Sequence, residues 1–513
     1  MRFRYHKTDF YIVLLVTVVS SFTPDTSSYD AYGLKIAAND VLFVQSNPSQ
    51  RFFRIFPPSN SWSYCTINYE DMNQYIYAVA VARQTTLNDT IRFVFTGVKT
   101  TDVPFMGSLT YVNTSVVDNT STTMTIEDFV FSCDGWNNSN YKIHTIDQFL
   151  YDTDVQNDNH LDFFVVAVEP TGHFAYAFTQ QFLLLYNLDT DNVSMQLGNI
   201  TWPNTSFLPH AVDISDEFVV VLGFVGDPMT NYTPCAFLLN RSDSTLKVLD
   251  QWSYTPPTNR SWQASLTNID ADSYAAQYDM SVSINPTGGQ VLLGIQITNT
   301  IVLLNINRSA NKFILPPQSV SNGQAIGMGK AVGWFDANTS VVLVNTYSFS
   351  YIWSASRVFV YNMALFNSSG IMSVFPNAQQ PLATGFGPIL ITLVVTVTGT
   401  VTMLDSQGDI SIIFPAAPGS YADTSWGTVS WALDCIGGTF NPQLSIGPCV
   451  LCPQGNSTNG LTGQSICMSC EKDAFCPTGA AFGNISTSSS ILTSASQALA
   501  YPVSPQSFVS TIF

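Results

Sequence analysis

The sequence predicts an all-β fold on three observations. Short runs of Val, Ile, Phe, Tyr and Thr, separated by Gly, Asn, Asp, Ser and Pro, fill residues 30–430, which is the pattern of strands joined by turns. Segments with the apolar spacing of a helix are few in the same region. Hydrophobic residues make up 46% of the 513 residues and aromatic residues 13%, so the chain can bury a large core and is not a disordered protein.

Hairpin-like blocks recur along residues 30–430 and suggest the architecture. The clearest strand runs are Phe218–Phe224, Val291–Ile297, Ile301–Ile306, Val341–Val344 and Val358–Tyr361. Blocks begin near Tyr176, Phe218, Val291, Val341 and Ile389, at intervals of about 40 to 70 residues. Propeller blades repeat at about 40 to 50 residues, so we predict a divergent β-propeller of about seven blades. Tandem β-sandwiches are the alternative, but no linker rich in Pro, Gly or Ser divides the region.

The N-terminus has the pattern of a secretory signal peptide over residues 1–21. Arg2, Arg4 and Lys7 form a basic head, and an apolar run follows over Phe10–Val19. Small and polar residues come next, as at a cleavage site. The alternatives are an N-terminal anchor or a buried strand, although ten apolar residues are too few to span a bilayer. The chain is therefore expected to be extracellular, either secreted or as the ectodomain of a membrane protein.

A second apolar stretch, Gly387–Leu404, has two interpretations. Its 18 residues carry no charge, which is close to the length of a membrane span. However, Thr recurs along it and β-branched residues dominate, which favours a pair of buried strands. We predict the strand pair.

Nine cysteines fall into two groups. In the first group we predict a bond between Cys65 and Cys133 and a buried free thiol at Cys235. The second group has six members within a region that we assign as a separate module, residues 435–480: Cys435, Cys449, Cys452, Cys467, Cys470 and Cys476. Four of these also have the spacing of a zinc site, but an oxidising compartment favours disulfides. Six cysteines allow 15 connectivities, and the sequence does not choose between them.

The second cysteine group resembles a known module. The motifs Cys435-Ile-Gly-Gly-Thr and Cys449-Val-Leu-Cys452-Pro-Gln-Gly are similar to those of the tyrosine-protein kinase ephrin type A/B receptor-like module. The resemblance implies a disulfide-bonded extracellular spacer or interaction module without kinase activity. Residues 481–513 form a Ser/Thr-rich tail or stalk, similar to uncharacterised invertebrate ectodomains that continue into a transmembrane helix. The resemblance implies contact with a membrane only through a segment beyond Phe513.

Asn-X-Ser/Thr sequons are about twice as frequent as chance predicts for this composition. Glycans would solubilise a surface whose charged residues are only 11% of the chain. The 15 predicted glycosylation sites are Asn88, Asn113, Asn119, Asn137, Asn192, Asn199, Asn204, Asn231, Asn240, Asn259, Asn307, Asn338, Asn367, Asn456 and Asn484.

An acidic segment is a candidate calcium site. Oxygen-bearing side chains alternate along Asp154, Gln156, Asp158 and Asp162, as a hard cation such as calcium requires. The segment resembles the calcium loop of integrin-α-type propeller repeats. Two departures weaken the resemblance: Gln156 is a poor ligand, and Asn159 stands where that loop has Gly. A solvated acidic loop is the alternative, and we predict no other cofactor.

Composition and motifs together favour a binding function. The net charge of −18 argues against nucleic acid as a partner. No Gly-X-Ser-X-Gly or His-Glu-X-X-His motif occurs, so we predict that the chain is not an enzyme. The expected function is an extracellular binding or adhesion module for an unidentified protein or glycan ligand. The alternative is a secreted propeller hydrolase of glycans, whose paired carboxylates could meet only in space.

Overall fold

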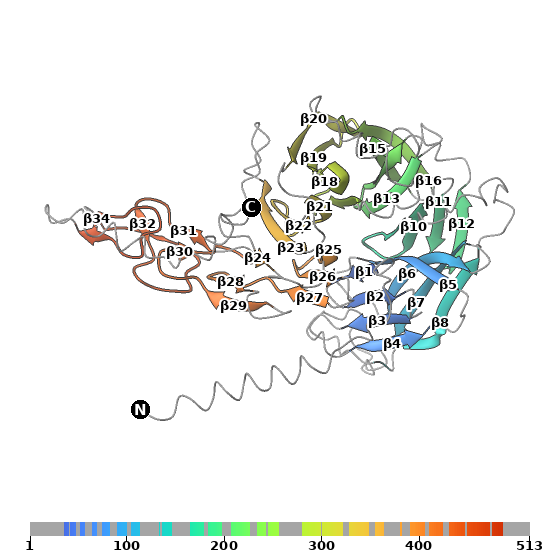
Figure 1. Cartoon of the computed structure of the whole chain (residues 1–513), viewed down its shortest axis with the longest axis horizontal. Helices are drawn as coiled ribbons and strands as arrows, with labels where there is room; N and C mark the ends of the chain where they lie inside the picture. The colour runs from blue at the N-terminus through green and yellow to red at the C-terminus, as the bar shows by residue number, and fades with distance from the viewer. Residues whose placement is uncertain are drawn as a thin grey trace.

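The computed structural model describes the strands of the whole 35–485 region and the turns that connect many of them (Figure 1). The described residues are 35–39, 42–47, 52–56, 64–68, 74–82, 90–99, 104–112, 133, 136–145, 165–178, 183–196, 207–225, 233–242, 245–255, 280–298, 300–321, 328–347, 354–363, 380–381, 390–405, 410–423, 430–446, 449–471 and 474–485. The predicted signal peptide lies outside them, and of the predicted tail, residues 481–513, only 481–485 are described. Among the described residues, no helix has the length and hydrophobicity that crossing a membrane would require.

Six sheets have four antiparallel strands each, in chain order from the first strand to the fourth. The first sheet contains β1 (Lys35–Ala38), β2 (Phe43–Asn47), β3 (Phe52–Phe56) and β4 (Cys65–Asn68). The second contains β5 (Gln74–Val81), β6 (Thr90–Lys99), β7 (Pro104–Val112) and β8 (Trp136–Thr145). The third contains β9 (Val165–Val168), β10 (Phe174–Phe178), β11 (Leu183–Asn187) and β12 (Asn192–Gln196).

The next three sheets repeat this order. The fourth contains β13 (Phe207–Ile214), β14 (Phe218–Val225), β15 (Thr233–Ser242) and β16 (Thr245–Ser253). The fifth contains β17 (Met280–Ile284), β18 (Gln290–Ile295), β19 (Thr300–Asn307) and β20 (Lys312–Ser321), with the 3₁₀ turn η6 (Gln296–Thr298) between its second and third strands. The sixth contains β21 (Met328–Trp334), β22 (Thr339–Tyr347), β23 (Ser354–Asn362) and β24 (Gln380–Pro381).

A seventh sheet closes the ring. It consists of β25 (Leu390–Val395), β26 (Val401–Asp405) and β27 (Ile410–Ile413). The first strand of each sheet contacts the first strand of the next, and β25 contacts β1. A shared apolar cluster, which includes Ile36, Phe43, Leu404 and Ile412, fills the joint between the seventh sheet and the first. The ring in Figure 1 is therefore a β-propeller, which confirms the predicted fold class. The sandwich alternative is wrong, because the sheets pack around an axis and not face to face in pairs.

Complete four-stranded blades number six among the described residues, against the predicted count of about seven. The seventh sheet has three strands because the chain turns away after β27. The backbone N–H of Ser430 donates to the Ile412 carbonyl oxygen at 3.0 Å. From there β29 (Trp431–Asp434) pairs with β28 (Ser420–Asp423) and does not continue along β27.

Strand β14 of the fourth sheet is buried on both of its faces. In β14 the side chains of Val219 and Val221 pack into the cluster shared with the third sheet. Their neighbours Val220 and Leu222 pack into the cluster shared with the fifth sheet. A continuous apolar run is thus explained by burial on two sides, because alternate residues of a strand point to opposite faces.

The apolar stretch Gly387–Leu404 supplies the two strands β25 and β26, as predicted. Thr396 closes the turn between them, with its hydroxyl oxygen accepting the Thr400 N–H at 3.2 Å. Gly399 is required in this turn, since its φ is +86° and a Cβ atom would overlap the Phe335 ring.

Beyond the ring, the chain forms four short two-stranded ribbons in sequence, drawn in orange and red in Figure 1. The first ribbon is β28–β29. The others are β30 (Thr439–Phe440) with β31 (Val450–Leu451), β32 (Asn456–Ser457) with β33 (Met468–Ser469), and β34 (Ala474–Phe475) with β35 (Asn484–Ile485). Ala422 and Ile446 join the apolar cluster of the sixth and seventh sheets. We call the four ribbons the C-terminal module (described residues from Ser420 to Ile485), and these contacts attach it to the propeller.

Candidate functional site

The turns between the first and second strands share one design in five of the seven sheets. The residue that follows the first strand is polar, and its side-chain oxygen accepts the backbone N–H of a residue at or next to the start of the second strand. The side-chain oxygen thus takes the place of a backbone carbonyl in the turn, and the pairing between the two strands is kept. The five residues are Asn39, Glu169, Ser215, Asn285 and Thr396. We call the side of the ring that carries these turns the turn face.

This design contains an internal repeat that sequence analysis missed. Glu169-Pro-Thr-Gly172 and Asn285-Pro-Thr-Gly288 are nearly identical. The glycine in each has a positive φ, 79° and 70°, and donates its N–H to the first residue of the motif. A second signal is an Asn near the end of the third strand in four sheets, namely Asn187, Asn240, Asn307 and Asn362. A search for these two spaced signals would have found the blades.

Ion pairs join neighbouring sheets across the turn face. Arg241 in the fourth sheet contacts the Glu169 carboxylate of the third at 2.5 Å, and the two side chains are only 18% and 2% exposed. The second carboxylate oxygen of Glu169 accepts the N–H groups of His173 and Phe174. Arg308 of the fifth sheet makes the corresponding pair with Glu217 at 3.4 Å, but there both side chains are about half exposed. The acidic and basic groups of this face therefore stabilise the ring.

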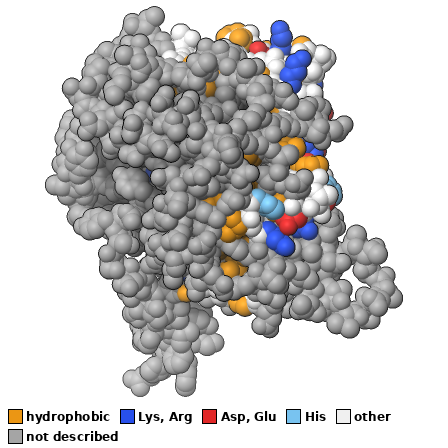
Figure 2. Space-filling model, turned by 90° about the vertical axis from the view of Figure 1, so that its right-hand side faces the viewer, with side chains coloured by type: hydrophobic (Ala, Val, Ile, Leu, Met, Phe, Trp, Pro, Cys, Tyr) orange, Lys and Arg blue, Asp and Glu red, His pale blue; other side chains and the backbone are white. Residues whose placement is uncertain are grey.

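A polar cluster at the joint of the second and third sheets is the other group of titratable side chains. Asp191 accepts hydrogen bonds from the Tyr186 hydroxyl at 2.6 Å and from His144 Nε2 at 3.0 Å. The Tyr186 hydroxyl also contacts Ser108 Oγ at 2.8 Å. Burial of Tyr186 raises the pKa of its phenol, so the group stays a donor. Figure 2 shows one side of the molecule, on which acidic, basic and histidine side chains lie together among hydrophobic ones.

The pKa of Asp191 is lowered in this cluster. Partial burial acts in the opposite direction, but the hydrogen bonds from Tyr186 and His144 outweigh it, and Lys142 adds attraction at 3.9 Å. A carboxylate with a lowered pKa that faces a phenol is a stabilised acceptor, not a general acid. The cluster resembles a structural joint more than a catalytic centre.

The cysteines form four disulfides among the described residues. Cys65 is bonded to Cys133, which is the predicted pair. The module contains the bonds Cys435–Cys449, Cys452–Cys467 and Cys470–Cys476, so the six cysteines pair in sequence order. Cys235 is free and buried, and burial raises the pKa of its thiol to about 11. That thiol is therefore unreactive at neutral pH. All four cysteines of the alternative zinc site form disulfides, so their sulfurs are not available as zinc ligands.

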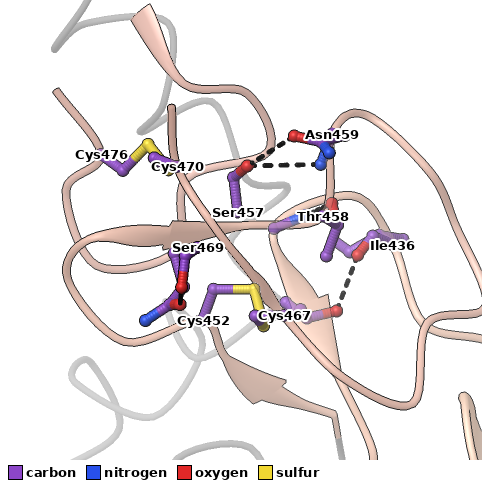
Figure 3. The surroundings of a disulfide bond; sticks show 12 residues. Ile436, Cys452, Ser457, Thr458, Asn459, Cys467, Ser469, Cys470 and Cys476 are labelled. Carbon is purple, nitrogen blue, oxygen red and sulfur yellow. Dashed lines mark hydrogen bonds between the residues drawn. A yellow bond between two sulfur atoms is a disulfide. The ribbon is translucent and has the colours of Figure 1, made fainter. Parts of the chain in front are cut away.

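The glycines of the resembled motifs have a structural reason in the module. The N–H of Cys452 donates to the Gly438 carbonyl at 2.9 Å, and the N–H of Cys470 donates to the Gly455 carbonyl at 2.9 Å. Gly438 has φ +86°, and a Cβ atom there would overlap the Gly479 carbonyl oxygen. Figure 3 shows how closely the chain segments approach around Cys452 and Cys467. The resemblance to the ephrin receptor-like module remains a prediction.

The remaining predicted site residues are described only in part. The acidic segment with Asp154, Gln156, Asp158 and Asp162 lies outside the described residues, and no cluster of metal-ligating side chains occurs within them. Four sequon asparagines have described side chains. Asn307 and Asn338 are exposed, whereas Asn240 and Asn456 are half-buried. The other eleven predicted sequon side chains are outside the described set.

The module differs from the propeller in what it exposes. Fourteen large hydrophobic side chains are exposed among the described residues, and eleven of them belong to the module. The propeller contributes Ile314, Leu315 and Val397. The module contributes Trp431, Leu433, Ile436, Leu444, Val450, Leu451, Leu461, Ile466, Met468, Phe475 and Phe482. This exposed apolar surface is the candidate functional site.

No protein-family model and no curated protein matches the chain. Solved structures with a similar arrangement include the tricorn protease, at 9% identity and a TM-score of 0.40 over 74% of this chain. The chain spans only 33% of that protein. A functionally unknown protein from Desulfotomaculum acetoxidans DSM 771 has 11% identity and a TM-score of 0.38, covering 72% of this chain and 94% of its own. Dipeptidyl peptidase 4 of Porphyromonas gingivalis has 11% identity and a TM-score of 0.33, covering 82% and 57%.

Proposed function

We propose that this protein is a non-enzymatic extracellular binding or adhesion protein that uses the C-terminal module as its contact element. The observation that carries the proposal is the concentration of exposed apolar side chains on the module. Exposed apolar side chains that are concentrated in one part of a folded protein favour contact with another molecule. Trp, Phe and Met, which the module exposes, are also the residue types enriched at protein interfaces.

Small size alone does not account for this surface. A module held by disulfides buries little and must expose some apolar side chains. However, its ribbons could carry polar residues at the exposed positions, and residues 430–485 contain only four charged ones: Asp434, Glu471, Lys472 and Asp473. The apolar choice at so many exposed positions supports a function in recognition.

Several features support an extracellular location. Disulfides persist in oxidising compartments, and the chain has four among its described residues. The signal-like N-terminus and the excess of sequons are consistent with secretion, or with the ectodomain of a membrane protein. The partner in this proposal is an extracellular protein or glycan, and calcium bound by the acidic segment would serve structure and not catalysis.

The contacts of the acidic side chains favour binding over hydrolysis of glycans. Glu169 is held in a buried ion pair. Asp213 accepts the Ile284 N–H at 2.7 Å, and Asp250 accepts the Phe313 N–H at 2.9 Å. Asp213 and Asp250 thus bond backbone groups of the next sheet, and Glu169 bonds an arginine of the next sheet, so these three carboxylates are engaged in structural contacts and do not form the acid and nucleophile pair of a glycosidase.

Binding to cell surfaces tests the proposal. The full secreted chain, labelled with fluorophore, is titrated onto fixed animal cells and onto the same cells after protease or glycosidase treatment. The double variant Phe475→Lys/Phe482→Lys alters the module, and the matched control Ile314→Lys/Leu315→Lys alters exposed hydrophobics of β20. We expect the module variant to weaken binding about tenfold or more and the control to have little effect.

Two results would contradict the proposed function. One is equal binding by the module variant and the control. The other is release of soluble sugar from purified animal glycans with repeated turnover, which would show a hydrolase.

A further inference from the structure

Among the described residues, one edge of the first ribbon of the module has no partner strand. Strand β29 (Trp431–Asp434) pairs only with β28 among the described residues, and all four of its residues are exposed. Exposed apolar edges are normally short, charged or covered, because they can pair with another chain. Strand β29 is itself short, but three of its four residues are uncharged, and its sequence is Trp-Ala-Leu-Asp.

Hydrogen bonds fix which backbone groups point outward. The N–H of Cys435 donates to the Gly419 carbonyl beside β28, so the N–H groups of Trp431 and Leu433 also point toward β28. The N–H of Ser430 points the other way and donates to Ile412. By alternation, the N–H and C=O groups of Ala432 and Asp434 point outward from the ribbon. These are the groups that a further strand would bond.

The side chains on β28 and β29 give the edge two different faces. Register pairs Tyr421 with Leu433 and Asp423 with Trp431, so these four side chains share one face. Trp431 is 62% and Leu433 41% exposed on that face. The other face carries the small Ala432 and the Asp434 carboxylate, which lies near Ser420 Oγ at 3.4 Å.

From this edge we infer that two copies of the chain pair through β29, in antiparallel register about a two-fold axis at Leu433. Ala432 of one copy lies opposite Asp434 of the other, and the outward groups of these residues form the hydrogen bonds. Leu433 meets Leu433 of the second copy, and Tyr421 extends the apolar row on both sides. The result is a four-stranded sheet with an isologous interface.

The distribution of charge favours a second copy of the chain as the partner at this edge. The whole chain carries −18, but only five charged residues lie in the module, residues 420–485, with a sum of −3. Two copies therefore repel each other least where their modules meet. A strand from a basic partner would gain little here, because Asp434 is the one charged residue of β29.

This inference is independent of the proposed function, since two copies can pair whether or not the module binds cells.

The register of the proposed pairing can be tested with a covalent crosslink. Directly opposite residues in a non-hydrogen-bonded antiparallel pair have Cα atoms about 4.5 Å apart, which lies within the range for a disulfide. Leu433→Cys should therefore give a disulfide-linked dimer on a non-reducing gel as the main species. Leu444→Cys, which is 45% exposed in wild type, is the matched control and should stay mostly uncrosslinked.

A solution test uses light scattering of the purified full chain at about 10 µM, with wild type expected to be dimeric. Leu433→Lys should raise the dissociation constant about tenfold or more, because two lysines would meet at the axis. Ala432→Pro removes an outward N–H without removing a bond of the ribbon, and should act in the same direction. Leu461→Lys, at a 51% exposed position, should leave the dimer unchanged. Near-ultraviolet circular dichroism confirms that each variant is folded.

Any of three results would overturn the inference. The first is a monomeric wild type at this concentration. The second is a dimer that neither Leu433→Lys nor Ala432→Pro weakens. The third is equal crosslinking through Leu433→Cys and Leu444→Cys.

Discussion

Strands β14 in the propeller and β29 in the C-terminal module show two ways to stabilise an apolar strand. Every residue of β14 from Phe218 to Phe224 is buried, because sheets pack against it on both faces. Every residue of β29 is exposed, although three of its four residues are apolar or small. The propeller therefore draws its stability from apolar packing between sheets, whereas the module depends on disulfides and on close backbone contacts at glycine. Among the described residues, most of the large apolar side chains that remain exposed belong to the second region.

The largest effect should come from removing a side chain from a joint between sheets. Phe237 is fully buried and packs edge-on against Phe207, with ring centroids 4.7 Å apart. Phe237→Ala should lower the free energy of unfolding by about 3–5 kcal/mol, from lost burial and the cavity that remains. Urea denaturation followed by tryptophan fluorescence measures it. Phe482→Ala, at a position 64% exposed in the module, is the control and should change stability by about 0.5 kcal/mol or less. Equal effects would mean that the two regions are not stabilised differently.

The ion pairs of the turn face provide a second test within the propeller itself. Arg241 and Arg308 occupy corresponding positions in successive sheets, but only the pair with Glu169 is buried. Arg241→Ala leaves the Glu169 carboxylate buried without its partner, so we expect a loss of about 3 kcal/mol. Arg308→Ala breaks an exposed pair and should cost about 0–1 kcal/mol. Both variants keep the flanking sequons intact, so glycosylation does not confound the melting temperatures. Similar shifts for the two variants would refute the difference in burial.

The module should respond to loss of a disulfide without affecting the ring. The double variant Cys452→Ser/Cys467→Ser releases a loop of 15 residues and should destabilise the module by about 2–4 kcal/mol. Hydrogen exchange should then increase for residues 449–471 and stay unchanged for β14. Cys235→Ser, which alters the buried free thiol in the propeller, serves as the converse control. Faster exchange in β14 of the module variant would show that the ring depends on the module.

Sequence patterns predicted the parts of this fold that depend on local chemistry. The run Phe218–Phe224 and the stretch Gly387–Leu404 became strands because β-branched and apolar residues alternate between two packed faces. The Cys65–Cys133 pair was also predicted correctly. The difference in blade count arises because the chain leaves the ring after β27, and β28 pairs with β29 instead of with β27. The open edge of β29 was not predictable from the sequence. Whether a strand lies at the edge of a sheet depends on how the rest of the chain folds around it, and the residues of the strand alone do not show this. The calcium prediction at Asp154 and its neighbours remains a prediction.

The smallest expected effect is the pH dependence of the joint around Asp191. The pKa of this carboxyl is lowered in the folded protein, so its contribution to stability is present above the unfolded value of about 3.8. That contribution is lost as the pH falls below 3.8 and through the lowered folded pKa, where the carboxylate takes up a proton. Asp191→Asn should therefore destabilise the protein measurably at pH 7 and less at pH 2.5, because part of the contribution of the wild-type carboxylate is already lost below 3.8. Asp189→Asn is a matched control, since Asp189 forms an exposed pair with His173 at 2.7 Å on the same turn and should have a smaller effect at both pH values. If Asp191→Asn were equally destabilising at pH 7 and pH 2.5, the joint would depend on the shape of the side chain and not on its charge, and the negative charge of this carboxylate would not be needed to hold the second and third sheets together.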